Sequence, residues 1–325
     1  MTLVLGEKAV GGLLSMKEVV QAVDDCFRRV PESLAVNTPR TRTIVPGATL
    51  NVMHGAIPYL GRAGVKCYLS SRRGTRFVFV LFNLEDAEPL AIMGADALGR
   101  FRTGAASAVA TKHLAGTKSM RFAVAGSGKQ ARTQVLAMAE VATLESVTAW
   151  SPNSTHLADF VRGLGAVGID AKPAGSLRDA FASSDVATTI TTAKAPFVTR
   201  DDVQSLIHIN LCGSNSSNKS EATPQAVAEF QTVVTDDVEQ ARVESGDLIG
   251  AVEAGLLSWA NVVRLGDVVS GKINPGHKTL FKSNGVAIED VAVASLVYEK
   301  ARHSSEFSGS DVEIGTGKEK TADQS

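Results

Sequence analysis

The chain has 325 residues and a formal net charge of −1, from 33 basic and 34 acidic side chains. This balance leaves no global positive field to hold a polyphosphate backbone, so nucleic acid is not expected as a partner. Hydrophobic residues make up 44% and charged residues 21%, which is an ordinary globular composition for one large or two modest domains. Cys26, Cys67 and Cys212 lie far apart without CxxC spacing, so we expect no disulfide framework, no metal site and a cytoplasmic location. No basic segment leads into an apolar stretch at the start, and no apolar run reaches about 18 residues, so neither a signal peptide nor a membrane span is expected.

The first third of the chain is predicted to form a helix, a sheet and a second helix. Apolar residues at helical spacing follow a capping-box sequence that begins at Ser15, which predicts a helix over residues 16–30. Short β-branched and aromatic runs from residue 43 to about 84 indicate a sheet of several strands. Residues 102–114 are rich in alanine, so we expect a helix whose small side chains let another backbone come close.

After residue 118 the chain alternates between strand and helix patterns, which predicts a parallel sheet covered on both faces. The expected strands are 120–125, 147–150, 185–192 and 207–212, and the expected helices are 130–141 and 155–163. An apolar helix at 288–301 lies beyond this unit and could return to the first part of the chain. The polar, aperiodic residues 304–325 are expected to be a disordered tail.

A glycine-rich loop follows the strand expected at 120–125. Residues 126–131 read Gly-Ser-Gly-Lys-Gln-Ala, a G-x-G-x-x-A pattern between a buried strand and a helix. In this context Gly126 permits a tight turn, Gly128 lets a pyrophosphate approach the backbone, and Ala131 allows close packing of helix on sheet. The loop therefore predicts dinucleotide binding, with a plain structural turn as the alternative.

The choice between NAD and NADP stays open at this stage. An acidic residue at the end of the next strand would indicate NAD, and an arginine would indicate NADP. That strand ends at Trp150 and is followed by Ser151, Pro152 and Asn153, which supply neither. Lys129 could reach a 2′-phosphate, and it could equally be a solvated loop lysine.

Positively charged residues upstream of the loop suggest an anion site. Lys66 is the most informative, because apolar residues at 65, 67 and 69 on one side of a strand put Lys66 and Tyr68 together on the other. A lysine inside an otherwise apolar sheet needs a partner. The alternative is a surface strand with a solvated lysine.

Several blocks of sequence occur in an order that resembles the ornithine cyclodeaminase and mu-crystallin family. They are residues 64–68, 98–107, 126–131, 208–215, 244–247 and 280–290. The resemblance implies an α/β protein in which a Rossmann domain is inserted into a discontinuous α+β domain for substrate binding and dimerisation. We expect the substrate and dimerisation domain at residues 1–116 plus 280–303, the Rossmann domain at 117–279, and a homodimer.

Carried over position by position, the resemblance places Arg42, Lys66 and Arg102 around the α-carboxylate of a small imino or amino acid. Arginine can grip a carboxylate with two parallel hydrogen bonds, and lysine supplies a compact charge near the reacting nitrogen. Arg40 is close enough in sequence to take the place of Arg42. The expected cofactor-binding residues are Thr103, Gly126, Ser127, Gly128, Lys129, Gln130, Ala131, Ser151, Asn153, Thr191 and Ser283.

One departure from the family pattern narrows the chemistry. Cyclodeaminases and some alanine dehydrogenases of the family carry an aspartate where this chain has Asn215. An amide cannot act as a general base at neutral pH, although it can orient a water or an iminium. We therefore expect reduction of a small α-imino acid by NADH or NADPH, with Lys66 or a water held by Asn215 as the proton donor. The alternatives are cyclodeaminase-type loss of ammonia with bound NAD, and an NADPH-dependent ligand-binding protein of mu-crystallin type.

The remaining charged residues give weaker indications. Arg72, Arg73 and Arg76 could contact a second carboxylate of a dicarboxylic imine, although three arginines beside Gly74 more often form a solvated turn. His54 and His208 could each donate a proton, but a lone histidine is more often structural. For Asp290 an N-terminal helix-capping role competes with a role in the site.

Overall fold

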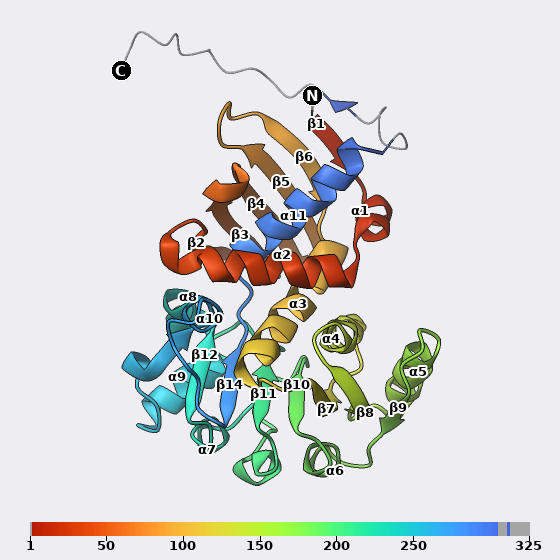
Figure 1. Cartoon of the computed structure of the whole chain (residues 1–325), viewed down its shortest axis with the longest axis vertical. Coiled ribbons are helices and arrows are strands. Elements are labelled where there is room, and N and C mark those ends of the chain that lie inside the picture. Colours follow the sequence, from red (N-terminus) through yellow and green to blue (C-terminus); the bar gives the residue numbers. More distant parts are fainter. Residues whose placement is uncertain (1, 305–310, 313–325) are drawn as a thin grey trace.

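The computed structural model describes residues 2–304 and 311–312. It is an α/β structure with two sheets, one in the upper and one in the lower half of the molecule as drawn in Figure 1. The chain begins in the upper sheet, builds the whole of the lower one, and returns to the upper sheet with its last helix. The predicted fold class is confirmed by this arrangement.

The first sheet is mostly antiparallel and has the order β15-β1-β6-β5-β4-β3-β2, with one parallel pair between β1 and β6. Its long strands have the period-2 pattern of a sheet buried on one face. The strands are β1 (Thr2–Leu5), β2 (Val36–Val45), β3 (Ala48–Ile57), β4 (Arg62–Ser71), β5 (Gly74–Asn83), β6 (Pro89–Gly94) and β15 (Asp311–Val312).

Helices cover one face of this sheet. Helix α2 (Met16–Arg29) buries an apolar stripe that includes Val19, Val23 and Phe27, which confirms the helix expected at 16–30. Helix α11 (Ala287–Arg302) lies across β3, β4 and β5 (Figure 1), so the last apolar helix does return to the first part of the chain. Helix α1 (Glu7–Leu13) packs beside β6 and α3.

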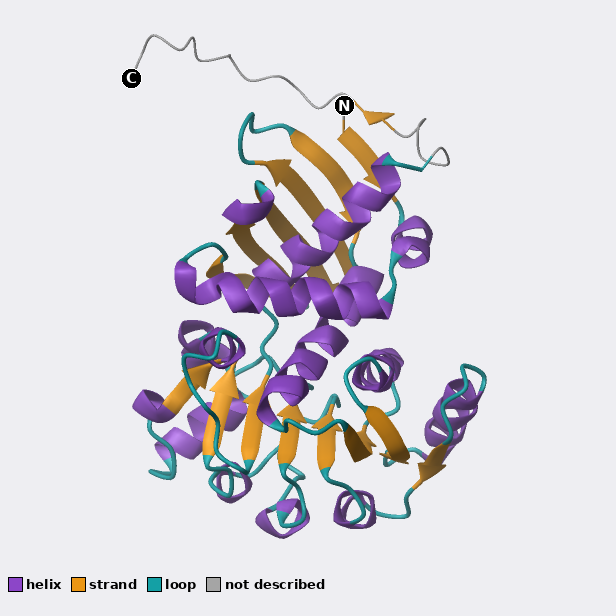
Figure 2. Cartoon of the chain, in the orientation of Figure 1, coloured by secondary structure: helices purple, strands orange, loops and turns teal. Residues whose placement is uncertain are grey.

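The second sheet has eight strands in the order β13-β12-β14-β11-β10-β7-β8-β9, and every neighbouring pair is parallel. The predicted parallel sheet is thus confirmed, and its strands carry helices on both sides (Figure 2). The strands are β7 (Ser119–Ala125), β8 (Thr143–Trp150), β9 (Ala171–Pro173), β10 (Val186–Thr189), β11 (His208–Leu211), β12 (Thr232–Thr235), β13 (Val262–Arg264) and β14 (Thr279–Lys282).

Between these strands lie mostly short helices, as expected where crossovers return the chain to the same edge of a sheet. They are α4 (Lys129–Ala139), α5 (Ser154–Gly165), α6 (Leu177–Ala182), α7 (Pro224–Val227), α8 (Val238–Glu244), α9 (Gly246–Glu253) and α10 (Leu265–Val269). Short 3-10 helices occur at Val30–Glu32, Pro58–Leu60, Arg200–Val203 and Trp259–Asn261.

The alanine-rich helix α3 (Asp96–Leu114) connects the two sheets. It packs against α2 above and against α4 and β11 below (Figure 1). At Gly104 a Cβ atom would lie 2.5 Å from the carbonyl oxygen of Thr133 in α4, so only glycine permits this approach. The expectation that small side chains admit a second backbone is confirmed.

Two expected boundaries change. Strand β14 pairs with β11 and β12 inside the second sheet, so the return to the first unit begins after Lys282 and not at residue 280. The cause is that all four β14 residues are buried in a parallel sheet. The predicted disordered tail lies largely outside the described residues, and within it Asp311–Val312 instead pair antiparallel with β1. The division at residue 116 stays a prediction.

Candidate functional site

A continuous cleft lies between the two units of the structure, which are the first sheet with its helices and the second sheet with its helices. It consists of three adjoining cavities. The loop cavity, of about 610 Å³, is lined by residues 126–128 and 150–153, His156, residues 190–193 and Phe197. The central cavity, of about 680 Å³, shares Gly128, Ile190, Thr191 and Thr192 with it. The cation cavity, of about 210 Å³, contains Arg40, Lys66 and Arg102 in its wall. It shares Thr75, Asp96, Arg100, Arg102, Thr103, Gln130 and Asn215 with the central cavity.

The glycine loop has the geometry that a pyrophosphate requires. Gly126 has φ +126°, and a Cβ there would lie 2.4 Å from the carbonyl oxygen of Ile190, so the position demands glycine. At Gly128 a Cβ would meet nothing within 4 Å, which leaves open space toward the cleft. Helix α4 begins directly after Gly128 without a side-chain cap, so its first backbone N–H groups are available to an anion. These features fit a dinucleotide.

The loop cavity offers an apolar surface and small polar groups. The rings of Trp150 and Phe197 stack with centroids 5.8 Å apart, and the Ser127 hydroxyl donates to the Ser151 hydroxyl at 3.0 Å. Asn153 caps α5 by accepting from the His156 backbone N–H. The residues that line the cavity include no carboxylate, so nothing in this wall repels a 2′-phosphate.

The cation cavity is built on the inner face of the first sheet. Cross-strand neighbours Met53, Lys66 and Phe79 form one row on this face, and Tyr68 and Phe77 belong to the next. The period-2 argument from sequence is therefore confirmed for Lys66 and Tyr68, which both line the cavity. The alternative of a solvated lysine is wrong, because the Lys66 side chain is only 3% exposed.

A β-bulge turns both arginines of β2 to the inner face of the sheet, and only one of them lines the cavity. The pairing of β2 with β3 slips by one residue between Thr38 and Thr41, which turns Arg40 to the inner face together with Arg42. Arg40 lines the cavity and Arg42 does not. Arg42 instead donates to the backbone carbonyl of Asn215 at 2.8 Å. Arg40 and not Arg42 therefore contributes to the wall of the cation cavity, and Arg42 holds the Asn215 loop.

Buried carboxylates neutralise these cations from behind. Lys66 Nζ lies 3.0 Å from Asp290 Oδ1, and Arg102 contacts Asp290 at 3.2 Å and Glu289 at 2.8 Å. Burial lowers the pKa of Lys66 to about 8, partly opposed by Asp290. Burial and the neighbouring Asp236 and Asp290 raise the pKa of Glu289 against the effect of Arg102. Asp290 is thus a partner of the cavity cations and more than a helix cap.

A further buried carboxylate forms ion pairs with both arginines of β2. Glu244 accepts from Arg40 at 3.0 Å and from Arg42 at 2.5 Å. Including the Arg100–Asp96 pair, five basic groups form ion pairs with four carboxylates in and behind the cation cavity. Arg40 Nε, Glu289 Oε1 and Asp290 Oδ2 are buried without a hydrogen-bond partner. An anionic ligand suits this cluster of cations, and the unpaired Arg40 Nε can donate a hydrogen bond to it.

The central cavity joins the glycine loop to the cations. It is lined by Thr103, Lys129, Gln130, Thr191, Asn215 and Ser283, all residues expected from sequence. Two buried acids that sequence reasoning did not assign hold its loops in place. Glu221 accepts hydrogen bonds from the backbone N–H groups of Thr191 and Gly213, and Asp236 accepts from those of Asn284 and Gly285.

Other candidates from the sequence lie outside the cleft. Ala131 belongs to α4 and is fully buried in the core, in the packing role predicted for it. His208 is buried and bonded to Thr279 and Asn210, and His54 is exposed on β3, so neither lines a cavity of the cleft. Arg72, Arg73 and Arg76 are exposed on the β4–β5 hairpin. Arg100, which sequence reasoning did not single out, does line the cleft.

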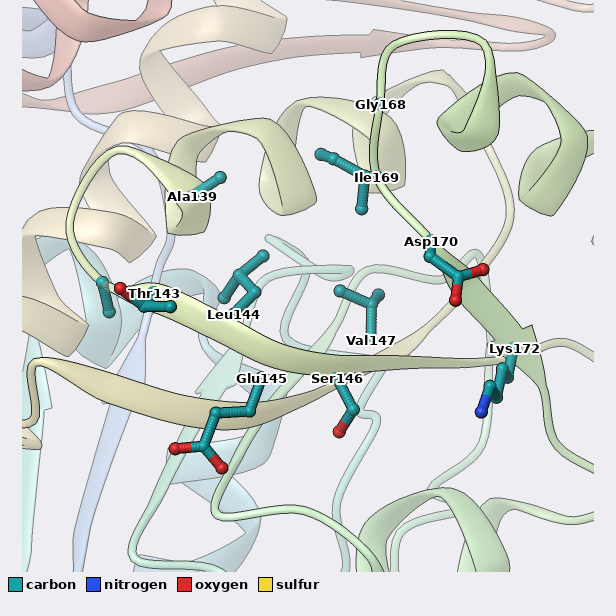
Figure 3. Close-up of a pocket in the computed structure, with 11 residues that line it drawn as sticks. Ala139, Thr143, Leu144, Glu145, Ser146, Val147, Gly168, Ile169, Asp170 and Lys172 are labelled. Carbon is teal, nitrogen blue, oxygen red and sulfur yellow. The ribbon is translucent and has the colours of Figure 1, made fainter.

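A separate cavity of about 440 Å³ lies beside β8 and β9 and shares no residue with the cleft. Figure 3 shows Leu144 and Val147 on one side of β8, with Glu145 and Ser146 turned to the other side. Its lining carries no cluster of catalytic side chains. In the part of the chain that the structure describes, no helix is long and apolar enough to cross a membrane, and no three potential metal ligands gather.

The family assignment follows from comparison of the whole chain. The family model described as "Ornithine cyclodeaminase/mu-crystallin family" matches residues 1–305. This chain belongs to the ornithine cyclodeaminase/mu-crystallin family. The resemblance read from the ordered sequence blocks is confirmed, and so is the combination of a Rossmann-like parallel sheet with a second sheet.

Members of the ornithine cyclodeaminase/mu-crystallin family with known activities are similar over nearly all of the chain. The alanine dehydrogenase of Archaeoglobus fulgidus is 33% identical over 315 residues, covering 92% of this chain and 95% of the relative. The iminosuccinate reductase of Paracoccus denitrificans is 31% identical over 317 residues, covering 93% of this chain and 97% of the relative. A solved structure of Thermococcus litoralis Δ1-pyrroline-2-carboxylate reductase with NADH and L-proline has a TM-score of 0.87 at 30% identity, covering 93% of this chain and 98% of that chain.

The two loop glycines allow a direct test of dinucleotide binding. The Gly128→Ala variant should fold as stably as the wild type, because its Cβ meets no protein atom within 4 Å. It should nevertheless bind NADH or NADPH at least ~10-fold more weakly, because the methyl group occupies the space of the pyrophosphate. Thermal unfolding and fluorescence titration with each cofactor measure the two effects.

Gly165→Ala is the matched control, because Gly165 also has open space but lies at the end of α5, outside the cleft. It should leave cofactor affinity unchanged. Gly126→Ala should lower the unfolding temperature, because the position has φ +126° and is crowded by Ile190. Wild-type cofactor affinity in Gly128→Ala would show that the pyrophosphate does not lie against this loop.

Proposed function

We propose that this protein reduces a small α-imino acid to the L-amino acid with NADH or NADPH, equivalently acting as an L-amino acid dehydrogenase in reverse. The observation that carries the proposal is the joining of two features in one cleft. The cation cavity, with Arg40, Lys66 and Arg102, opens into the central cavity, which ends at the dinucleotide loop. A carboxylate-bearing substrate held by the cations therefore faces the reactive end of the cofactor.

The cations suit the α-carboxylate of an imino acid. Arg40 and Arg102 are nearly buried, with side chains 1% and 8% exposed, and are fixed by carboxylates. Such preorganised guanidinium groups hold a carboxylate without losing much rotamer freedom on binding. They therefore fix the substrate's orientation, which is the main requirement for transfer to a C=N bond.

Residues of the second unit would hold the cofactor. Gly126, Ser127, Gly128 and the start of α4 would take the pyrophosphate, and Ser151 and Asn153 would face the adenosine ribose. Thr103, Gln130, Thr191 and Ser283 line the path toward the cations. When bound, the nicotinamide supplies the hydride. Because no carboxylate lines the loop cavity, we propose that both NADH and NADPH are accepted.

Lys66 or a water held by Asn215 would supply the proton to the imine nitrogen. Lys66 is in the wall of the cation cavity and is positioned by Asp290. Asn215 lines the same cavity, and Arg42 holds its backbone. Because Asn215 carries an amide, it can orient a water but cannot take a proton from one. This favours reduction over the water-dependent loss of ammonia in cyclodeaminases.

A substrate panel tests the proposal. The purified protein, mixed with NADH or NADPH, should oxidise the cofactor with pyrroline-2-carboxylate, piperideine-2-carboxylate, iminosuccinate, or pyruvate plus ammonia, and should form the L-amino acid. Nicotinamide absorbance follows the cofactor, and chiral chromatography identifies the product.

Other results of the substrate panel would support one of the two alternative functions. Ammonia release from ornithine or lysine without net change in NADH would establish cyclodeaminase chemistry. Tight NADPH binding with no reduction of any imine would establish a ligand-binding protein instead.

The pKa of Lys66 predicts how kcat/KM should depend on pH. Its pKa of about 8 means that the ammonium is present below pH 8 and lost above it. If Lys66 is the proton donor, kcat/KM for reduction of pyrroline-2-carboxylate should fall above that pH with a single-proton dependence. In Lys66→Met the rate at neutral pH should drop ~10²-fold or more, and this limb of the profile should disappear.

A cyclic imine is used because no free ammonia then titrates in the same range. Arg72→Ala serves as the control, since this exposed arginine lies outside the cleft and should leave the profile unchanged. A wild-type profile that stays level through pH 10, or one that Lys66→Met preserves, would remove Lys66 as the donor and leave the water at Asn215.

We also propose that the protein is a homodimer through the outer face of the first sheet. Leu50 and Leu69 are direct cross-strand neighbours on this face, as are Cys67 and Val78. Leu50, Leu69 and Val78 are 40%, 48% and 46% exposed. An exposed apolar patch on a sheet of this kind is typical of an interface, and a second copy supplies a matching apolar face.

The molar mass in solution tests this proposal. The wild type should have twice the chain mass of 34.0 kDa by light scattering, and Leu69→Glu should shift it toward the monomer because a charge enters the interface. Val243→Glu is the control, since Val243 is 64% exposed on α8, away from this face. A monomeric wild type, or a Leu69→Glu variant that stays dimeric, would refute the assignment.

A further inference from the structure

Arg100 differs from the other cations of the cleft. Arg40, Lys66 and Arg102 each bind a buried carboxylate. Among the residues that the structure describes, Arg100 forms an ion pair only with Asp96, one helical turn earlier, at 3.3 Å between Nε and Oδ2, and Asp96 is 44% exposed. Its Nε is buried without a hydrogen bond. Arg100 is therefore a cation in the cleft whose hydrogen-bonding capacity is largely unused.

Its place on α3 puts Arg100 at the junction of two cavities. Asp96, Gly99, Arg100 and Thr103 follow the i, i+3, i+4, i+7 spacing of one helix face. Arg100 and Thr103 line both the cation cavity and the central cavity. The Arg100 side chain is 27% exposed, so it reaches into open space without leaving the wall. A group extending from the cation cavity toward solvent would pass Arg100.

Gly99 keeps the space between Arg100 and the carboxylate site open. A Cβ at Gly99 would lie 3.1 Å from Lys66 Nζ, so any larger residue would crowd the ammonium. The first turn of α3 thus lies directly against Lys66 and presents the Arg100 guanidinium one residue further on. Lys66 and Arg100 both line the cation cavity.

Building on the proposed function, we propose that Arg100 binds a second carboxylate of the substrate and makes the enzyme selective for α-imino dicarboxylates. The α-carboxylate lies among Arg40, Lys66 and Arg102, and the distal carboxylate accepts hydrogen bonds from the Arg100 guanidinium. A planar guanidinium is the group best suited to grip a carboxylate with two parallel bonds. Arg100 takes the role considered from sequence for Arg72, Arg73 and Arg76, which lie outside the cleft.

The specificity ratio between matched substrates tests this proposal. Iminosuccinate, formed from oxaloacetate and ammonia, has one carboxylate more than the imine formed from pyruvate and ammonia. In the wild type, kcat/KM should be higher for iminosuccinate. In Arg100→Ala the ratio of the two kcat/KM values should fall by ~10- to 100-fold, as expected for one charged hydrogen-bonding contact. Arg100→Lys should lie between the two.

Arg72→Ala removes one exposed positive charge outside the cleft and should leave the ratio unchanged. An equal loss for both substrates in Arg100→Ala, or a raised KM for NADH with an unchanged ratio, would overturn the proposal by assigning Arg100 to the cofactor. A wild type that prefers the pyruvate-derived imine would also overturn it.

A binding measurement separates this proposal from the proposed function. Succinate and propanoate differ only by a second carboxylate and need no turnover. In the presence of NAD⁺, succinate should raise the unfolding temperature of the wild type more than propanoate does, and Arg100→Ala should abolish that difference. If no imine is reduced but this pattern is found, the function fails and the Arg100 contact stands. An equal effect of succinate on both proteins shows that the contact is absent.

Discussion

The cleft depends on pairing buried cations of the first sheet with buried carboxylates from the end of the chain. Lys66 on β4 and Arg102 on α3 meet Asp290 on α11, which lies 224 residues after Lys66. An isolated ammonium in a protein interior loses most of its hydration energy, so neither partner is stable alone in this position. Removing one member of such a pair typically costs about 3–5 kcal/mol. The return of α11 to the first sheet therefore closes the fold and brings the carboxylates to the cations of the cavity in the same contacts.

Most of the correct predictions came from local sequence patterns, such as the alternation of residues along a strand or a short motif. The alternation around Lys66 placed its side chain with that of Tyr68, and the six consecutive residues of the glycine loop predicted a pyrophosphate site. The choice between Arg40 and Arg42 could not be made in this way. Alternation puts both arginines on one face of β2 and so does not distinguish them. That this is the inner face follows from the one-residue slip in the pairing of β2 with β3, and a bulge depends on the partner strand. Pro39, which lacks an N–H for the ladder, is the one local signal of it.

Ion-pair partners that lie far apart in the chain could not be predicted either, because they too depend on the tertiary fold. Glu244 binds Arg40 across 204 positions, and no local pattern distinguishes it from a solvated glutamate. Glu221 and Asp236 contribute only indirectly to the cleft. They accept hydrogen bonds from backbone N–H groups of its loops and do not line the cavities themselves. These loops follow the carboxyl ends of β10, β11 and β14, where an open parallel sheet places its ligand site. The location of the cleft was thus predictable, whereas the groups that fix its loops were not.

The way each arginine is held indicates what it can contribute to recognition. Arg40 and Arg102 have lost their rotamer freedom to buried acids before any ligand arrives, so binding a carboxylate costs them little further entropy. The arginines on the β4–β5 hairpin are exposed and would lose that freedom on binding, besides competing with water. Arg100 lies between these extremes, in the cleft wall but near only a partly exposed acid. On the proposed function, the fixed cations would hold the α-carboxylate of any substrate, and the cation with free donors would be the one able to distinguish one substrate from another.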